Sequence, residues 1–159
     1  MILVQSGVVA GIEGFLIDVE VDVRPGLPGF EIVGLPSKTV RESRERVRSA
    51  LRNAGFKFPA QKVIVNLAPA HYPKDGALFD LPIALGVLAH QGVVPERVFQ
   101  DVIIAGELSL SGKIKRISGV LSLAQLAADC GFQIILPLEN RQEASLVESD
   151  RVLLVDSLG

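Results

Sequence analysis

In the stretch Phe15-Leu-Ile-Asp-Val-Glu-Val-Asp-Val-Arg24, apolar and charged side chains alternate from Ile17 onward. Successive side chains of a β-strand point to opposite faces, so a period of two predicts a strand with one buried face and one solvent-exposed face. The apolar run 2–10 precedes it, and the glycine-containing segment 11–14 separates the two. The two runs are therefore predicted to form an antiparallel β-hairpin.

Outside this hairpin, turn-forming residues divide the chain into further strands and helices. Strands are predicted at 30–33, 62–68, 133–136 and 151–155, and a second hairpin at 102–110 and 113–117 with Ser111-Gly112 in its turn. Helices are predicted at 37–54, 80–91, 121–130 and 140–147, with Ser37 and Asp80 as caps of the first two. This mixture predicts an α+β fold, a mixed sheet packed with helices, and we expect residues 1–159 to form a single domain.

The composition of the 159 residues, 48% hydrophobic and 21% charged, predicts a buried core and excludes an intrinsically disordered chain. The longest stretch without a formal charge, 81–95, is shorter than the roughly 20 residues that a membrane-spanning helix needs. The first residues lack the basic segment of a signal peptide. Cys130 is the single cysteine, so no internal disulfide can form, and we expect it to be a small core residue. These features predict a cytoplasmic protein that does not contact a membrane.

Phosphate-binding and metal-binding patterns are incomplete in this sequence. In segment 106–113, five residues separate the two glycines instead of four, and Ile114 follows the lysine where a magnesium-binding Ser or Thr is needed. The two histidines, His71 and His90, lie far apart in the sequence, whereas a zinc site needs three or four convergent ligands. We therefore expect no ATP hydrolysis, no metal and no cofactor in this chain.

The predicted helix 37–54 carries a row of arginines. Six basic and two acidic residues give this segment a net charge of +4, and the total of −2 for the chain leaves −6 elsewhere. Four arginines fall within roughly 80° of one another on a helical wheel: Arg41, Arg44, Arg48 and Arg52. Such a row can bind the phosphates of a nucleic acid or the carboxylates of a neighbouring subunit, or it can be a solvated helix face. Because the total charge is negative, a solvated face or a subunit contact is favoured over a nucleic acid for this helix.

Two segments carry the strongest functional information when they are considered together. They are Pro73-Lys-Asp-Gly76 before the helix 80–91, and the run from Gly106-Glu-Leu-Ser-Leu-Ser-Gly112 to Pro137-Leu-Glu-Asn140. Both resemble the proteolytic domain of Lon proteases. The position of that family's nucleophilic serine is Leu78 here, and the position of its general-base lysine is Leu121. Because leucine can neither attack a carbonyl nor accept a proton, the resemblance implies a degenerate dyad without peptidase activity by that mechanism.

The first half of the chain specifies the subfamily. Four segments resemble the N-terminal domain of magnesium-chelatase-like AAA+ ATPases of the ComM/YifB type: 28–36 (PGFEIVGLP), 40–50 (VRESRERVRSA), 66–70 (NLAPA) and 79–84 (FDLPIA). This resemblance implies a ribosomal protein S5 domain 2-like fold, shared with the Lon protease domain. It also implies an AAA+ module downstream that binds ATP and magnesium, a hexameric ring of sister subunits, and DNA processing in branch migration during natural transformation. DNA is then an implied partner.

The leading hypothesis is therefore a non-catalytic interaction and assembly domain of a ComM/YifB-type AAA+ ATPase. Two alternatives stay open at this point. One is a serine peptidase of Lon-like fold with a relocated dyad, and the other is a free-standing regulatory module. Lys74 and Asp75 are expected to shape a turn ahead of the buried helix.

Overall fold

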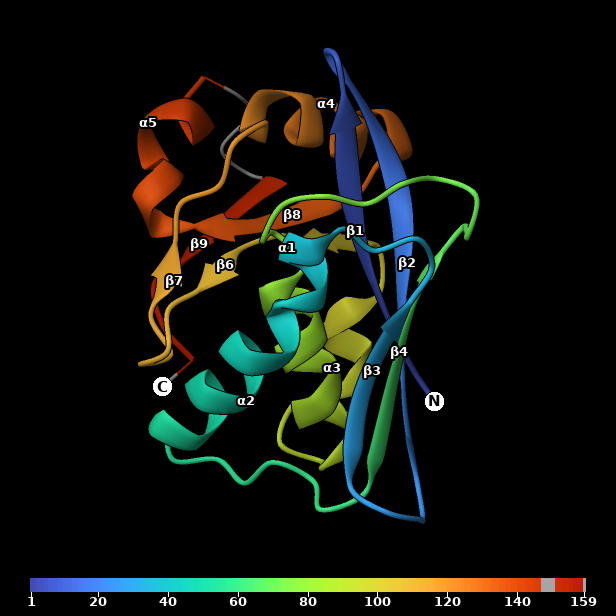
Figure 1. The fold of residues 1–159 in the computed structure, drawn as a ribbon. Helices are drawn as coiled ribbons and strands as arrows, with labels where there is room; N and C mark the ends of the chain where they lie inside the picture. Colours follow the sequence, from blue (N-terminus) through green and yellow to red (C-terminus); the bar gives the residue numbers. More distant parts are fainter. Residues whose placement is uncertain (147–150, 159) are drawn as a thin grey trace.

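The computed structural model describes residues 1–146 and 151–158, and its central feature is a seven-stranded mixed β-sheet (Figure 1). In spatial order, its strands are β3 (Gly29–Val33), β4 (Lys62–Ala68), β2 (Glu13–Arg24), β1 (Ile2–Ala10), β5 (Val102–Ile104), β8 (Gln133–Pro137) and β9 (Val152–Val155). Antiparallel pairing joins β4 to β2 and β2 to β1, and the other neighbours are parallel. This sheet, packed with helices, confirms the predicted fold.

The predicted N-terminal hairpin is confirmed as the pair β1 and β2. The strands pair antiparallel along their length, and the alternation of side chains matches the prediction. Ile17 and Val19 are fully buried, whereas Asp18 and Glu20 on the opposite face are partly exposed. Burial of this apolar row fixes the register, because a slip by one residue would move every side chain to the wrong face.

Three helices cover one face of the sheet: α1 (Lys38–Arg41), α2 (Ser43–Asn53) and α3 (Asp80–His90) (Figure 1). Ser37 caps α1 as predicted, since its hydroxyl accepts a hydrogen bond from the Val40 amide at 3.2 Å. The prediction of one continuous helix is wrong, because the helix is interrupted at Glu42. The Arg41 carbonyl near this break accepts a hydrogen bond from the Arg44 guanidinium at 3.1 Å, which satisfies it in place of a helical amide.

The prediction that Asp80 caps α3 is also wrong. Its carboxylate lies between α3, α2 and strand β6 (Glu107–Leu108), where it accepts hydrogen bonds from the Ser43 hydroxyl, the Arg46 guanidinium and the Leu108 amide. Burial raises the pKa of the Asp80 carboxyl, and the hydrogen bonds from Arg46 and Ser43 oppose that rise. Asp80 therefore joins three elements instead of terminating one.

Helix α4 (Val120–Cys130) packs against β1, β2 and β8 on the other face of the sheet. Glycine permits this close packing, since a Cβ atom at Gly7 of β1 would lie 2.9 Å from Cδ2 of Leu123. Gly131, with φ +72°, ends α4 as predicted. The expectation of a buried Cys130 is wrong, because the last turn of α4 is exposed to solvent.

The predicted hairpin at 102–117 is wrong in its first half. The first three residues form β5, which is fully buried and belongs to the main sheet. Only β6 and β7 (Ile114–Lys115) form a separate antiparallel pair. The division occurs at Gly106, whose amide donates to the Leu78 carbonyl at 2.9 Å and whose carbonyl accepts from the Leu81 amide at 3.0 Å. This segment is therefore bound to the start of α3 by its main chain.

Three short helical segments remain in the part of the chain that the structure describes: η1 (Glu96–Phe99), η2 (Leu138–Asn140) and α5 (Arg141–Ala144). The helix predicted at 140–147 corresponds to α5, and its expected end at Val147 lies outside the described residues. No helix in the described part of the chain is both long and apolar enough to cross a membrane.

Candidate functional site

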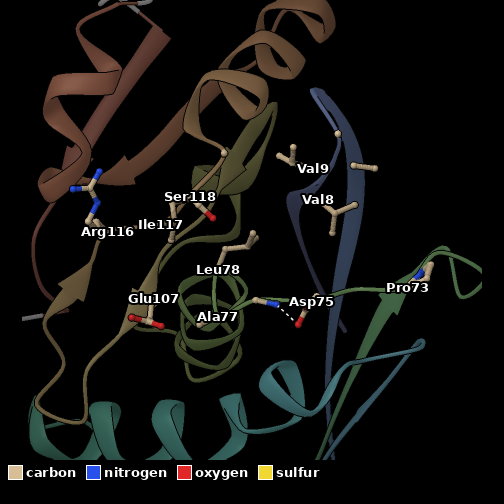
Figure 2. A pocket seen from close by; sticks show the side chains of 14 residues that line it. Val8, Val9, Pro73, Asp75, Ala77, Leu78, Glu107, Arg116, Ile117 and Ser118 are labelled. Carbon is tan, nitrogen blue, oxygen red and sulfur yellow. Dashed lines mark hydrogen bonds between the residues drawn. The ribbon is translucent and has the colours of Figure 1, made fainter.

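A pocket of about 660 Å³ lies between the end of β1 and the segments that lead into α3, β6 and α4 (Figure 2). Four parts of the chain line it: residues 8–11 of the first hairpin, residues 73 and 75–78 before α3, Glu107 of β6, and residues 116–119 before α4. Segments distant in sequence thus meet around Leu78, the serine position of the Lon-like pattern.

The end of β1 forms one wall because this strand extends beyond β5. The described pairing between β1 and β5 consists of Gln5 opposite Ile103, so residues 8–10 have β2 on one side and the pocket on the other. The opposite wall comes close at Gly119, where a Cβ atom would lie 2.9 Å from Cγ2 of Val9. Gly119 also has φ +79°, so glycine is required there for two reasons.

Leu78 projects into the middle of this pocket. Figure 2 shows its side chain between Val8 and Val9 on one side and Ile117 and Ser118 on the other. Leu78 is half-buried and packs against the apolar clusters on both faces of the sheet. Its isobutyl group places hydrocarbon where the Lon-like pattern has a nucleophile.

Leu121 lies in the first turn of α4, is 49% exposed and does not line the pocket. The structure therefore places Leu78 in the pocket and leaves Leu121 outside it. Ser118 is the lining residue with a hydroxyl, and the lining contains neither a lysine nor a histidine. The carboxylates of Asp75 and Glu107 also line the pocket, but among the described residues no hydrogen bond joins either of them to the Ser118 hydroxyl.

Two charged groups of the pocket, Asp75 and Arg116, are held by hydrogen bonds to their neighbours. Hydrogen bonding from Ser37 and from the Gly76 amide lowers the pKa of Asp75, whose Oδ1 accepts from that amide at 2.8 Å. The Arg116 guanidinium donates to the Glu143 carboxylate outside the pocket. These groups can bind or orient a polar ligand, but none of them forms a nucleophile–base pair.

Lys74 does not face the pocket. It is 1% exposed, and its ammonium donates to the carbonyl of Pro69. Its main chain bonds to the segment before α1, with the Lys74 amide donating to the Leu35 carbonyl at 3.1 Å and the Ser37 amide donating to the Lys74 carbonyl at 2.9 Å. Burial lowers the pKa of the Lys74 ammonium. Lys74 therefore anchors the loop that borders the pocket.

The arginine row divides into exposed and packed members. Arg41 and Arg52 are exposed, whereas Arg44 and Arg48 are half-buried. The Arg48 guanidinium lies over two phenylalanine rings, 5.9 Å from the centroid of Phe30 and 5.4 Å from that of Phe58. Part of the predicted contact surface therefore packs against β3 and the segment after α2.

A second pocket of about 330 Å³ lies beside this row. Its lining residues are Pro28, Gly29, Arg48, Arg52, Phe58, Pro59 and Ala60. The sequence interpretation identified the arginines but not the aromatic residues, because helical spacing says nothing about a side chain packed from another element. Among the described residues, no group of three or more His, Cys, Asp or Glu is placed to hold a metal ion.

Comparison with known proteins defines the class of this fold and pocket. The family profile described as subunit ChlI of Mg-chelatase matches residues 19–140. The chain belongs to this magnesium-chelatase-like family of AAA+ proteins. The resemblance expected from the sequence is thereby confirmed.

Particular relatives agree with this assignment. The chain is 39% identical over 156 residues to the uncharacterized protein YifB of Escherichia coli, and 40% identical over 156 residues to the competence protein ComM of Haemophilus influenzae. Each alignment covers 98% of this chain and 31% of the relative. At greater distance, the chain is 29% identical over 174 residues to Lon protease 2 of Bacillus subtilis, covering 95% of this chain and 31% of that protein. The chain thus spans about a third of the length of these relatives.

Proposed function

We propose that this chain is a non-catalytic interaction and assembly domain at the N-terminus of a ComM/YifB-type AAA+ ATPase. The observation that carries the proposal is the pocket around Leu78, which has a hydrocarbon side chain at the serine position of the Lon-like pattern and neither a lysine nor a histidine in its lining. A cavity that combines apolar side chains with a few charged groups, but lacks a paired nucleophile and base, is suited to binding and positioning rather than to covalent catalysis.

The remaining parts of the proposal concern the longer protein. In it, a downstream AAA+ module binds ATP and magnesium, and sister subunits form a hexameric ring in the cytoplasm. The family resemblance and the similarity to a competence protein support a role in DNA processing. The exposed arginines Arg41 and Arg52 support a contact with DNA or with a neighbouring subunit, because both partners present anionic groups.

The absence of peptidase activity is the first expected result. The chain should neither react with a serine-directed fluorophosphonate nor cleave unfolded casein, because the pocket lining has no lysine or histidine and no described hydrogen bond joins the Ser118 hydroxyl to a carboxylate. An active Lon proteolytic domain serves as the positive control. Casein cleavage that Ser118→Ala abolishes would instead establish the alternative of a relocated dyad.

The assembly role makes a second prediction, for the longer protein encoded by the same gene. Sedimentation velocity in the presence of ATP should show hexamers for that protein and smaller species after deletion of residues 1–159. Unchanged hexamers after the deletion would contradict the assembly role. A gene without a downstream Walker A sequence would favour the alternative of a free-standing regulatory module.

A further inference from the structure

The pocket beside α2 combines positive charge with an apolar and aromatic wall. Arg48 and Arg52 supply the charge from successive turns of α2. Phe58, Pro28 and Pro59 supply flat apolar surface from two loops. A binding site of this composition is suited to a ligand that is anionic on one side and planar and apolar on the other.

The two arginines are available to an anion. Arg48 has Glu45 as its neighbouring carboxylate, at 3.8 Å on an exposed side chain, which makes a weak ion pair. No carboxylate lies within 4.0 Å of the Arg52 guanidinium among residues 1–146 and 151–158. Arg52 is also exposed, so its guanidinium can turn toward a ligand without breaking a described contact.

The aromatic rings give the pocket a fixed shape. Phe30 and Phe58 stack with their centroids 5.2 Å apart and their planes inclined by 26°. Arg48 lies over both rings and is only 31% exposed in its side chain. Stacking on an aromatic face restricts a guanidinium while its N–H groups stay available to an acceptor, so Arg48 is preorganised for binding.

We propose that this pocket binds one nucleotide of single-stranded DNA, with its phosphate on Arg48 and Arg52 and its base against Phe58. The inference rests on the DNA contact in the proposed function and specifies its site and substrate. A single strand fits better than a duplex, because its unpaired bases can leave the stack and enter a concave pocket. A base that stays stacked and paired presents only its edges.

The charge distribution sets the expected strength of this binding. The net charge is −2 for the whole chain but +4 for segment 37–54, so the excess of positive charge lies in and around α2. Binding through a few phosphate contacts is weak and falls steeply with salt. We therefore expect the contact to act in a multivalent assembly, in which several copies of the pocket engage one strand.

Fluorescence anisotropy of the 159-residue chain with a short fluorescein-labelled oligothymidylate tests the pocket. At about 50 mM salt, the chain should bind the single strand more tightly than a duplex of equal length. Arg52→Gln should weaken single-strand binding roughly five- to ten-fold and lower the salt dependence by about one phosphate contact. Arg97→Gln is the matched control, because this arginine is exposed and lies on η1 outside the pocket.

The aromatic part of the proposal has its own variant. Phe58→Leu should weaken binding of the single strand roughly five-fold and leave competition by inorganic tripolyphosphate unchanged, because stacking distinguishes a base from a bare anion. Circular dichroism and thermal unfolding confirm that each variant is folded. If Phe58→Leu weakens binding of the single strand and of tripolyphosphate equally, the proposed contact between Phe58 and a base is wrong.

The outcomes separate this inference from the proposed function. Binding that Arg52→Gln and Arg97→Gln leave equally intact would overturn the pocket but keep a DNA contact elsewhere. Tighter binding of the duplex would overturn the single-strand assignment. No binding at low salt would contradict both the pocket and the DNA contact, and the assembly role would still be decided by sedimentation of the longer protein.

Discussion

Replacement of Asp80 by alanine is expected to lower the free energy of unfolding by about 3 kcal/mol, because it removes the acceptor shared by three elements. Asp80 is fully buried. Its Oδ2 accepts from the Arg46 Nε at 2.6 Å and from the Leu108 amide at 3.1 Å, and its Oδ1 accepts from the Ser43 hydroxyl. The loss lies at the lower end of the range for broken buried pairs, because the Arg46 side chain is 20% exposed and can be partly rehydrated.

Urea denaturation of the variant measures this loss, and Asp22→Ala is the matched control. Asp22 also pairs with an arginine, Arg24 at 2.8 Å, but this pair lies at the surface. Exposed ion pairs add little to stability, so the control should unfold like the parent chain. Asp80→Asn should fall between the two, because an amide oxygen can still accept from the Leu108 amide. Equal stability of Asp80→Ala and Asp22→Ala would show that the buried network is not a stabilising centre.

The second large effect is expected at Gly34, where alanine should lower the free energy of unfolding by about 3 kcal/mol or more. Gly34 has φ +104°, which is unfavourable for an L side chain. A Cβ atom there would also lie 2.2 Å from the carbonyl oxygen of Leu67 in β4. Because that oxygen belongs to a paired strand, the collision can be relieved only by movement of the main chain.

Gly55→Ala separates the cost of the positive φ from the cost of the collision with the Leu67 carbonyl oxygen. Gly55 has φ +93°, close to the value at Gly34, but a Cβ atom there has nothing within 4 Å. This variant should therefore lower the free energy of unfolding only by the cost of the positive φ, about 1–2 kcal/mol in the same denaturation experiment. If Gly34→Ala and Gly55→Ala lose the same amount, the close approach to Leu67 is not a constraint on the fold.

Strands and helix ends that depend on neighbouring residues in the sequence could be predicted from it. Alternation in β2, the Ser37 cap of α1 and Gly131 after α4 each depend on residues a few positions apart. The prediction of a hairpin strand at 102–110 is wrong, because a short apolar run does not distinguish a hairpin strand from a buried parallel strand. The role of Asp80 could not be derived from helix rules, since its partner Arg46 lies 34 residues away.

In the candidate site too, contacts between residues far apart in the sequence could not be predicted from local patterns. Motif resemblance placed Leu78 at the serine position, and the structure places it in the pocket. The wall formed by Val8 and Val9 had no local signal, because it depends on how far β1 extends beyond β5. Phe58 beside Arg48 was missed for a similar reason, although a chain with only 5% aromatic residues makes each ring a candidate for a specific contact.

The main-chain hydrogen bonds of Gly106 bear on how position 78 can change in evolution. Its amide and carbonyl hold the Leu78 carbonyl and the Leu81 amide, so main-chain atoms fix the start of α3 and the floor of the pocket. Such bonds are indifferent to the side chain at position 78. The main-chain frame around position 78 can therefore hold different side chains there, and the cost of a change is limited to the packing of Leu78 against the two apolar clusters.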